Sequence, residues 1–452
     1  MCRKPLSASL LLLLAAGLAG CAGTAQRTEA SARRQMQQTG ASLLAREGRP
    51  PLPVLRADSP QEAFVLYAVL NHPSVAAAYY DWRAGVEDVV QARSLPDPQF
   101  VFQADITRTL SSLMPGLMFA FPGSGKRQAM GEVALAEASV SRRAYEEAVT
   151  SAAAEARKAW IELAYIGEAI RLKAESEGII ARELSIAAAG YETGSAMGSL
   201  SIQIRLKNDL AQAESEKFDL EHRRLEARSR LKYALGIGPS EPDPAWPDAA
   251  LALTPVPAED ALWRRITASN PGLARMREMV EMAEAGIASA RRAGKPDFAL
   301  GAMVDVRSNP TLFRPVATVD LPVWRDKIAS LVAAAQARRD ASAARYSAGE
   351  LEVAAELARM IHMVHESDRM IAFIDRDGLP NLAQALASAE ASAESGPSGA
   401  AMIPETQAMA NAMRAERASA LRDREAAVTD LLLLTAEAAP AGAPLPLNPA
   451  NS

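Results

Sequence analysis

Residues 97–106 read DPQFVFQADI, at the point where a long helical pattern stops. The even positions of this stretch are apolar, whereas the odd positions include Gln103 and Asp105. Such alternation indicates a β-strand with one apolar and one polar face. The prolines just before it, Pro96 and Pro98, end the preceding helix. The stretch therefore marks a change from helix to strand.

Residues 295–304 read KPDFALGAMV and repeat this plan 198 positions later. The helix openings His72-Pro73 and Asn270-Pro271 share the same offset. Two further runs alternate downstream, at 117–121 and 317–321. The chain is therefore an internal duplication that carries two strands in each copy. Strands of this length with two unlike faces match membrane-spanning strands, and the alternative is a small soluble sheet packed on a core.

Each copy is expected to form a helix, two strands, a long helix, a turn and a return helix. The first helix is predicted from a capping box at Ser59-Pro60-Gln61-Glu62 to about Ser94. The long helices and return helices follow from Ala-rich, proline-poor sequence with apolar steps of three and four residues. Their expected spans are 259–293 for the second opening helix, 123–190 and 323–394 for the long helices, with an irregularity near Gly378-Leu379-Pro380, and 199–235 and 405–436 for the return helices.

The composition limits the possible functions. The chain has 452 residues, a net charge of −5 and two cysteines, so a nucleic-acid footprint, a disulfide framework and a cysteine zinc site are not expected. The apolar residues are mainly Ala and Leu, and only 5% of residues are aromatic, which favours long, close-packed helices. No stretch of about 18 apolar residues occurs. If the chain crosses a membrane, we expect it to do so with strands.

The N-terminus predicts the compartment. Residues 1–20 have a basic start and a short apolar centre, as in a secretory signal. Leu18-Ala19-Gly20-Cys21 resembles the bacterial lipobox, so Cys21 is the expected lipidation site, and Ala22 after it favours the outer membrane. The alternative is an ordinary cleaved signal with an incidental cysteine. The arm 21–58 is expected to be an extended strap, and the tail 438–452 is expected to be disordered.

Four membrane-length strands cannot close a barrel, and open strand edges are not tolerated in lipid. The chain is therefore expected to oligomerise so that several copies share one barrel. Repeat 1 (59–237) and repeat 2 (259–437), joined by the Pro-rich linker 238–258, both place long helices on one side of their strands. Helices of this kind pack side by side into a tube, and a tube continuous with a barrel is a conduit.

The chain resembles outer-membrane efflux proteins of the TolC family, the exit ducts of tripartite pumps. The residues that carry the resemblance are the lipobox, His72-Pro73, Asn270-Pro271, Leu95-Pro96-Asp97-Pro98, Phe121-Pro122-Gly123, Lys126-Arg127, Tyr191-x-x-Gly194, Leu231-x-x-Ala234-Leu235-Gly236 and Leu321-Pro322-Val323-Trp324. The resemblance implies a mainly α fold with a small β part, and a homotrimer with a twelve-stranded barrel and a twelve-helix periplasmic tunnel. It also implies a periplasmic adaptor protein and an inner-membrane transporter as partners, and no cofactor. Within the family, the resemblance points to the heavy-metal branch, whose members serve cobalt–zinc–cadmium or copper export.

Two groups of candidate site residues follow. Under the alternation, Asp105, Asp297, Asp305 and Asp320 face the barrel lumen, where acidic rings favour cations, unless they only make the lumen polar. By the resemblance, the far ends of the helical hairpins meet the adaptor and gate the tunnel. The residues there are Tyr191, Glu192, Gly194, Glu394, Gly396, Gly399 and Glu405. Pro397 replaces the usual motif at the second tip, and solvated turn chemistry is the alternative for both tips.

The sequence gives little support for other chemistry. The second long helix contains a cluster of Met360, His362, Met363 and His365. Methionine and histidine are ligands that suit soft metals, and the spacing of His362 and His365 allows them to share one face. The plainer interpretation is that the methionines fill the helix seam and the histidines are surface residues. Residues 123–127 lack the spacing of a phosphate loop. Lys126 and Arg127 are instead expected to meet lipid head groups, with Trp324 as an interfacial anchor. No catalytic constellation is present in the sequence, so no enzyme activity is expected.

The sequence thus predicts a passive, lipid-anchored export duct in the bacterial outer membrane that extends into the periplasm and carries metal ions or small toxic compounds. The alternative is a periplasmic coiled-coil lipoprotein that tethers or scaffolds the envelope without forming a pore. An adaptor protein is disfavoured because the strands lie between the helices of two hairpin units.

Overall fold

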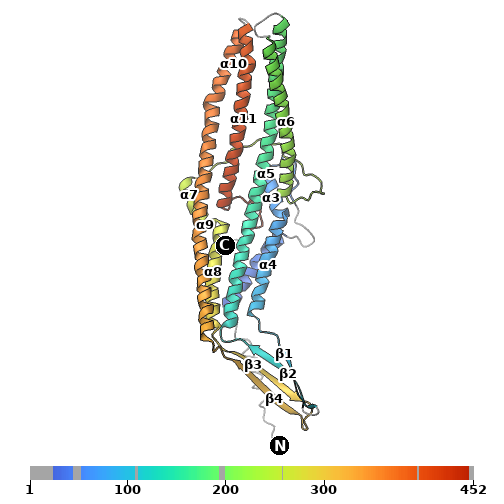
Figure 1. The fold of residues 1–452 in the computed structure, drawn as a ribbon, viewed down its shortest axis with the longest axis vertical. Helices are drawn as coiled ribbons and strands as arrows, with labels where there is room; N and C mark the ends of the chain where they lie inside the picture. The colour runs from blue at the N-terminus through green and yellow to red at the C-terminus, as the bar shows by residue number, and fades with distance from the viewer. Residues whose placement is uncertain are drawn as a thin grey trace.

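The computed structural model describes residues 24–43, 52–106, 110–192, 199–256, 258–393 and 397–446. The molecule is long and narrow, with a sheet at one end and two helical hairpins at the other (Figure 1). The predicted class, mainly helical with a small antiparallel sheet, is confirmed. None of the described helices has an apolar stretch long enough to cross a bilayer.

The sheet contains one strand pair from each copy. The strands β1 (Gln99–Ile106), β2 (Leu110–Phe121), β3 (Asp297–Asp305) and β4 (Leu312–Asp320) are antiparallel neighbours in chain order. The central pair, β2 and β3, joins the two copies, with Phe121 opposite Phe298. β2 begins seven residues before the alternating run 117–121, because Pro115 and Gly116 still pair with Phe102 and Val101.

Each expected opening helix is in fact two helices. Helix α3 (Gln61–Asn71) ends before α4 (Pro73–Arg93), and α7 (Glu259–Ser269) ends before α8 (Pro271–Arg292). The reason is the same in both copies: proline is the first residue of the second helix, where it needs no N–H partner, and the residue before it is the N-cap. His72 Nδ1 accepts from the Ser74 amide at 3.2 Å, and Asn270 Oδ1 accepts from the Leu273 amide at 2.8 Å.

The predicted capping box is wrong. Pro60 is the N-cap of α3 and makes no side-chain cap bond. The Ser59 hydroxyl instead accepts from the Arg56 amide at 2.9 Å, in a turn before the helix.

An asparagine fastens each helix break to the end of the return helix of the same copy. Asn71 Nδ2 donates to the Leu235 carbonyl at 2.8 Å, and Asn270 Nδ2 donates to the Leu434 carbonyl at 2.9 Å. Gly236 follows the first return helix with φ +69°, where a Cβ would lie 2.8 Å from the His72 Cα. Only glycine fits this close approach.

The long helices differ between the copies. Helix α5 (Lys126–Glu192) runs for 67 residues and returns as α6 (Leu200–Ala234). In the second copy, α9 (Arg325–Phe373) gives way to a π-helical turn, η2 (Ile374–Gly378), and then to α10 (Leu379–Ala393). This turn is the predicted irregularity. The return helix α11 (Pro397–Leu434) starts eight residues before the predicted start and contains Pro404.

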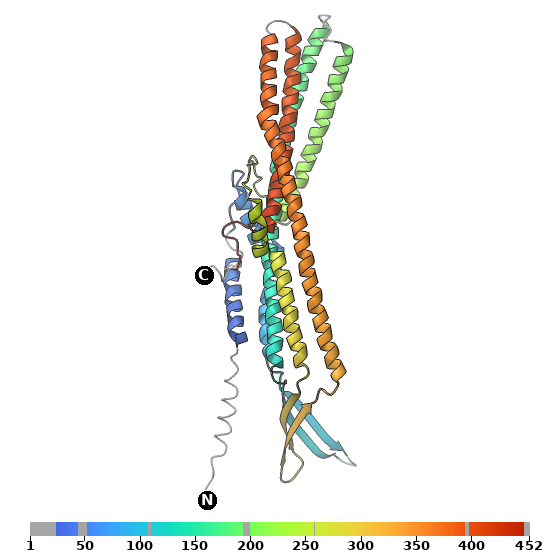
Figure 2. The ribbon, with the colours of Figure 1, turned by 90° about the vertical axis from the view of Figure 1, so that its left-hand side faces the viewer.

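The N-terminal arm is a helix rather than the predicted extended strap. Helix α2 (Thr24–Leu43) lies along α4 (Figure 2). The buried Glu29 pairs with Arg93 at 2.7 Å, and Arg33 pairs with Glu87 at 2.6 Å. Met36 packs against Tyr79 farther along α4. These partners are distant in sequence, so the contacts that hold the arm against the body cannot be read from the arm itself.

Part of the tail that was predicted to be disordered also packs on the body. Ala438 is fully buried, and the Arg157 side chain donates to its carbonyl at 3.2 Å. The Tyr145 hydroxyl donates to the Pro444 carbonyl at 2.5 Å, and burial raises the pKa of that hydroxyl. The tail to residue 446 is thus ordered against α5, and 447–452 lie outside the described residues.

Candidate functional site

The register places all four predicted aspartates on one face of the sheet. Asp297 is opposite Asp320 at the end of the sheet next to the helices, and Asp105 is opposite Ser112 near the other end. The Ser112 hydroxyl donates to Asp305 at 2.9 Å, so Asp105 and Asp305 lie on either side of Ser112 on the same face. The same face also carries Arg314, glutamine and threonine, together with glycine, alanine, methionine, valine and leucine residues. That this face lines a lumen stays a prediction.

Besides its strand pairing with Asp320, Asp297 makes side-chain contacts that the sequence does not reveal. Its carboxylate accepts from the Gly123 amide at 2.6 Å and pairs with Lys126 at 2.8 Å. Since Asp297 starts β3 and Lys126 starts α5, the pair joins the two copies at the junction of sheet and helices. Lys126 was expected to meet lipid head groups, but in the structure its charge is paired with Asp297 inside the protein.

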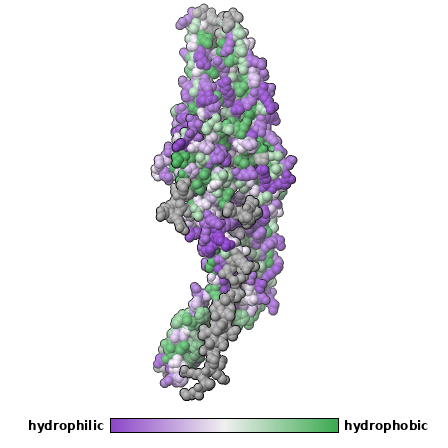
Figure 3. All heavy atoms as spheres, turned by 180° about the vertical axis from the view of Figure 1, so that it is seen from behind, coloured by the Kyte–Doolittle hydropathy of each residue, from purple (hydrophilic) through white to green (hydrophobic). Residues whose placement is uncertain are grey.

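The opposite face of the sheet is apolar across all four strands. Its phenylalanine side chains are exposed in the single chain, with Phe100 at 69% and Phe313 at 68%. The residues that share this face by register are Phe100, Phe102, Pro115, Leu117, Phe119, Phe121, Phe298, Leu300, Ala302, Val304, Phe313, Pro315, Ala317 and Val319. Figure 3 shows apolar side chains gathered over the sheet at the lower end of the molecule. A soluble monomer rarely exposes a continuous apolar surface of this kind.

Two further apolar seams run along the helices. Helix α6 packs on α5, whereas α9 packs on α8 and α11, so each has a free side along opposite edges of the molecule (Figure 1). Both helices carry large exposed apolar residues, which recur at helical spacing on α6. They are Leu200, Ile204, Phe218, Leu225 and Tyr233 on α6, and Leu331, Leu351, Met370 and Phe373 on α9.

The structure describes some of the predicted tip residues. Tyr191 and Glu192 end α5 and are exposed, and Glu405 is exposed on α11. Gly399 lies in the first turn of α11, so the predicted turn 395–399 is partly helix. Gly194, Glu394 and Gly396 lie outside the described residues.

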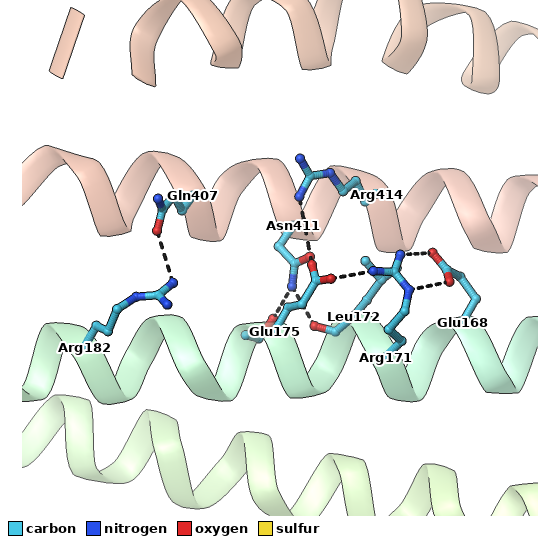
Figure 4. A network of polar contacts seen from close by, with 9 residues as sticks. Glu168, Arg171, Leu172, Glu175, Arg182, Gln407, Asn411 and Arg414 are labelled. Atoms are coloured by element: carbon cyan, nitrogen blue, oxygen red, sulfur yellow. Dashed lines mark hydrogen bonds and ion pairs between the residues drawn. The ribbon is translucent and has the colours of Figure 1, made fainter. Parts of the chain in front are cut away.

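Below the tips, a polar network connects α5 of the first hairpin with α11 of the second (Figure 4). Asn411 is 2% exposed, and its amide donates to the Leu172 carbonyl at 2.6 Å and to the Ser176 hydroxyl at 2.7 Å. Arg182 reaches Gln407 at 3.4 Å. These bonds hold the two hairpins together over three turns of helix.

A chain of charges flanks Asn411 on the exposed side of the network. Arg171 pairs with both Glu168 and Glu175, and Arg414 of α11 approaches Glu175 at 4.0 Å. The hydrogen bond from Arg171 lowers the pKa of Glu168. Exposed pairs of this kind add little stability individually, so the buried Asn411 is the main fixed point.

A second charged group lies closer to the tips. Burial raises the pKa of the Glu183 carboxyl on α5, Arg205 of α6 opposes the rise, and Glu405 and Asp209 add to it. Carboxylates from α5, α6 and α11 thus act on one another near the tips. Glu405 is the member of this group that sequence reasoning identified.

Sequence reasoning missed Asn411 and Glu183. A lone asparagine in the Ala- and Met-rich stretch of α11 is the available signal, because a buried asparagine fixes register between packed helices. Glu183 gives no such signal, since its burial depends on α6 and α11.

The methionine and histidine cluster of α9 does not converge on one point. Met360 is fully buried in the core between α7, α9 and α11. His362 faces Glu366 at 3.6 Å, whereas His365 faces Glu259 of α7 at 2.9 Å. Within the described ranges, no group of three or more His, Cys, Asp or Glu side chains is placed to hold a metal ion.

Comparison with known proteins identifies the family. A sequence profile described as "Outer membrane efflux protein" matches residues 67–237 and 262–437. The chain belongs to the outer membrane efflux protein family. The two matched segments fall one in each copy, which confirms the duplication that the offset of the strand motifs predicts.

Solved structures with this fold include outer membrane efflux channels. The outer-membrane channel OprN is 15% identical, with 88% of this chain and 95% of that chain covered and a TM-score of 0.70. The open-state MtrE outer membrane channel of Neisseria gonorrhoeae is 17% identical (85% and 90% covered, TM-score 0.67). The CmeC outer membrane channel of Campylobacter jejuni is 12% identical (84% and 86% covered, TM-score 0.67). At these identities the similarity establishes the fold.

The similar proteins are channels rather than enzymes. A comparison with curated protein sequences gave no match.

Proposed function

We propose that this chain is one subunit of a passive outer-membrane exit duct, the channel component of a tripartite efflux system. The observation that carries the proposal is the apolar face that continues over all four strands, opposite a face that carries the four aspartates and other polar side chains among small and apolar ones. Strands of 8 to 12 residues match the length of membrane-spanning strands. In lipid, the outer edges of β1 and β4 need partners from other copies.

Three copies would complete the structure, as in the family's trimeric channels. The seams on α6 and α9 are different surfaces on opposite edges of the molecule. Packing α6 of one copy on α9 of the next is a head-to-tail contact, which closes into a ring of three when successive copies are related by a rotation of one third of a turn. β1 would pair with β4 of the next copy in the same arrangement. Both contacts support an assembly whose barrel and helical tube share one axis.

A signal segment 1–20 and lipidation at Cys21 fit the position of the arm. Helix α2 starts at Thr24, and Glu29 near its start pairs with Arg93 at the end of α4, immediately before the sheet. A lipid on Cys21 would thus lie at the end of the molecule that the apolar sheet face assigns to the membrane. This supports anchoring in the outer membrane with the helices in the periplasm.

The hairpin ends are the proposed contact with a periplasmic adaptor and, through it, with an inner-membrane transporter. Tyr191, Glu192 and Glu405 are exposed there. The Asn411 network holds the second hairpin against the first and would restrain opening of the tube. Transport energy would come from the inner-membrane partner, because a duct needs none itself.

The proposed cargo is a metal ion or a small toxic compound. A deletion strain that becomes sensitive to copper, zinc or cobalt indicates metal export, and one that becomes sensitive to dyes or detergents indicates the other class. Unchanged sensitivity to all of them would contradict an export role.

Conductance of the purified protein in a planar bilayer tests the duct directly. We expect discrete conductance steps from a cross-linkable trimer. A Leu225→Asp variant, changed in the α6 seam, is expected to lose the trimer and the conductance together, whereas Glu192→Gln at the exposed tip keeps both. A stable trimer without conductance would instead support the envelope tether.

A further inference from the structure

The chain passes from strand to long helix twice, and the two junctions use their charges differently. Residues 121–127 read FPGSGKR and lead into α5, and residues 321–327 read LPVWRDK and lead into α9. Both junctions lie at the level where the helices meet the sheet (Figure 1). The two junctions therefore occupy equivalent places in the fold but differ in their charged and aromatic residues.

The cations of the first junction are bound within the protein. Lys126 pairs with Asp297 at 2.8 Å, and the Arg127 side chain donates to the Arg93 carbonyl at 3.4 Å. Arg292 lies over the turn and donates to the Ser124 carbonyl at 3.4 Å. The first junction is thus an internal contact between the two copies.

The cations of the second junction are free. Arg325 and Lys327 are exposed, and neither side chain has a hydrogen bond or ion pair among the residues that the structure describes. Asp326 between them is the acidic residue of this segment and leaves it with a net positive charge. An open hollow of about 510 Å³ is bordered by residues 323–327.

Large apolar side chains lie directly beside these cations. Leu321 is 67% exposed, Val323 is 64% exposed and Trp324 is 75% exposed. Leu321 follows Val319, which belongs to the apolar face of the sheet. The surface therefore changes within seven residues from the apolar sheet face through tryptophan to free cations, as expected where acyl chains end and head groups begin.

We propose that the second junction binds the phosphate of an anionic phospholipid in the leaflet that faces the helices, and that the first junction does not. Arg325 and Lys327 provide the charge, Trp324 lies at head-group depth, and Leu321 and Val323 contact the acyl chains. This inference rests on the proposed function, because it requires the sheet to span the membrane. It assigns the lipid contact to one copy of the duplicated chain.

Lipid selectivity in vesicles tests the proposal. The full chain is reconstituted in phosphatidylcholine vesicles with spin-labelled phosphatidylglycerol or spin-labelled phosphatidylcholine, and the fraction of immobilised label gives their relative association with the protein. We expect phosphatidylglycerol to be preferred, and the preference to fall by up to about fivefold for each cation removed in Arg325→Gln and Lys327→Gln. It should also weaken as salt is raised.

The control is Arg338→Gln, an exposed cation on α9 about 16 Å beyond Lys327 at 1.5 Å per residue. It is expected to leave the preference unchanged. No preference in the unmodified protein, or an equal loss in the control, would overturn the proposal. Loss of the trimer in the double variant would assign these cations to a second copy of the chain and would also overturn it.

Measuring the conductance of the same samples distinguishes a failure of the lipid-site proposal from a failure of the proposed duct function. Normal conductance without lipid preference contradicts the lipid site alone. A protein that neither conducts nor restricts either lipid contradicts the proposed function.

Discussion

The two copies share one plan, but they are stabilised in different ways. The first contains an uninterrupted long helix and an aromatic core in which Trp82 stacks on Tyr145 at 5.7 Å and Phe64 is fully buried. The second has a smaller core around Met360 and a long helix interrupted by a π-helical turn. π-helical turns are frequent at functional sites. From this comparison we expect the first copy to be the more stable scaffold and the hairpin of the second copy to open more readily.

The largest expected effect concerns the two cores. Trp82→Ala removes a fully buried ring and is expected to destabilise the protein by about 3–5 kcal/mol. Trp263→Ala on α7 of the second copy removes a ring that is 38% exposed, and about 1–2 kcal/mol is expected from its partial burial. Thermal unfolding followed by circular dichroism in detergent measures both. Equal shifts for the two variants would contradict a scaffold centred on the first copy.

The next effect concerns the contact between the hairpins. Asn411→Ala removes two buried hydrogen bonds, to the Leu172 carbonyl and the Ser176 hydroxyl, which costs about 1–3 kcal/mol in total. Hydrogen exchange in the upper part of α11 is expected to accelerate by roughly 5- to 150-fold, while α5 is little changed. Gln407→Ala, which removes a 3.4 Å bond at the exposed Arg182, is the control with a small effect. If α5 accelerated as much as α11, the second hairpin would not be the movable one.

The smallest effect is a pH dependence at the tips. Burial raises the pKa of Glu183, so this carboxyl ionises at higher pH in the folded tip than in the unfolded chain. Ionisation therefore destabilises the folded tip as pH rises through the folded pKa, and the penalty disappears in acid. Hydrogen exchange near Glu183 is expected to show stronger protection at about pH 5 than at about pH 8, after correction for the intrinsic rate, by roughly a few-fold.

Glu183→Gln is expected to abolish this pH dependence and to increase protection at neutral pH. Glu192→Gln, at the exposed end of α5, is the matched control. A pH dependence that persists in Glu183→Gln would show that another group is responsible.

The sequence predicts the features that depend on local pattern. The alternation beginning at Phe100 predicts the strands because a sheet with two unlike faces imposes a period of two. Gly378-Leu379-Pro380 predicts the irregularity in the second long helix because glycine loses more backbone entropy in a helix and proline removes a helical hydrogen bond. The break at His72-Pro73 is ambiguous from sequence, since a proline fits the start of a helix as well as its interruption.

The features that depend on distant contacts could not be predicted. Helix α2 is held by Glu87 and Arg93, more than 50 residues away, and the tail is held by Tyr145. The Asn411 network depends on α5, 239 residues earlier in the chain. In the same way, the pattern identifies Asp297 as a polar strand residue, but its ion pair with Lys126 can be seen only in the folded chain.

The central claim is that one face of the sheet contacts lipid and the other contacts water. Single cysteines at Val101, Phe102, Gln103 and Ala104 of β1, introduced in the full chain reconstituted in vesicles, are tested with a water-soluble maleimide, with the unmodified chain as the background. The account predicts labelling at 101 and 103 and protection at 102 and 104. Equal labelling at all four positions, or the reverse pattern, would contradict it.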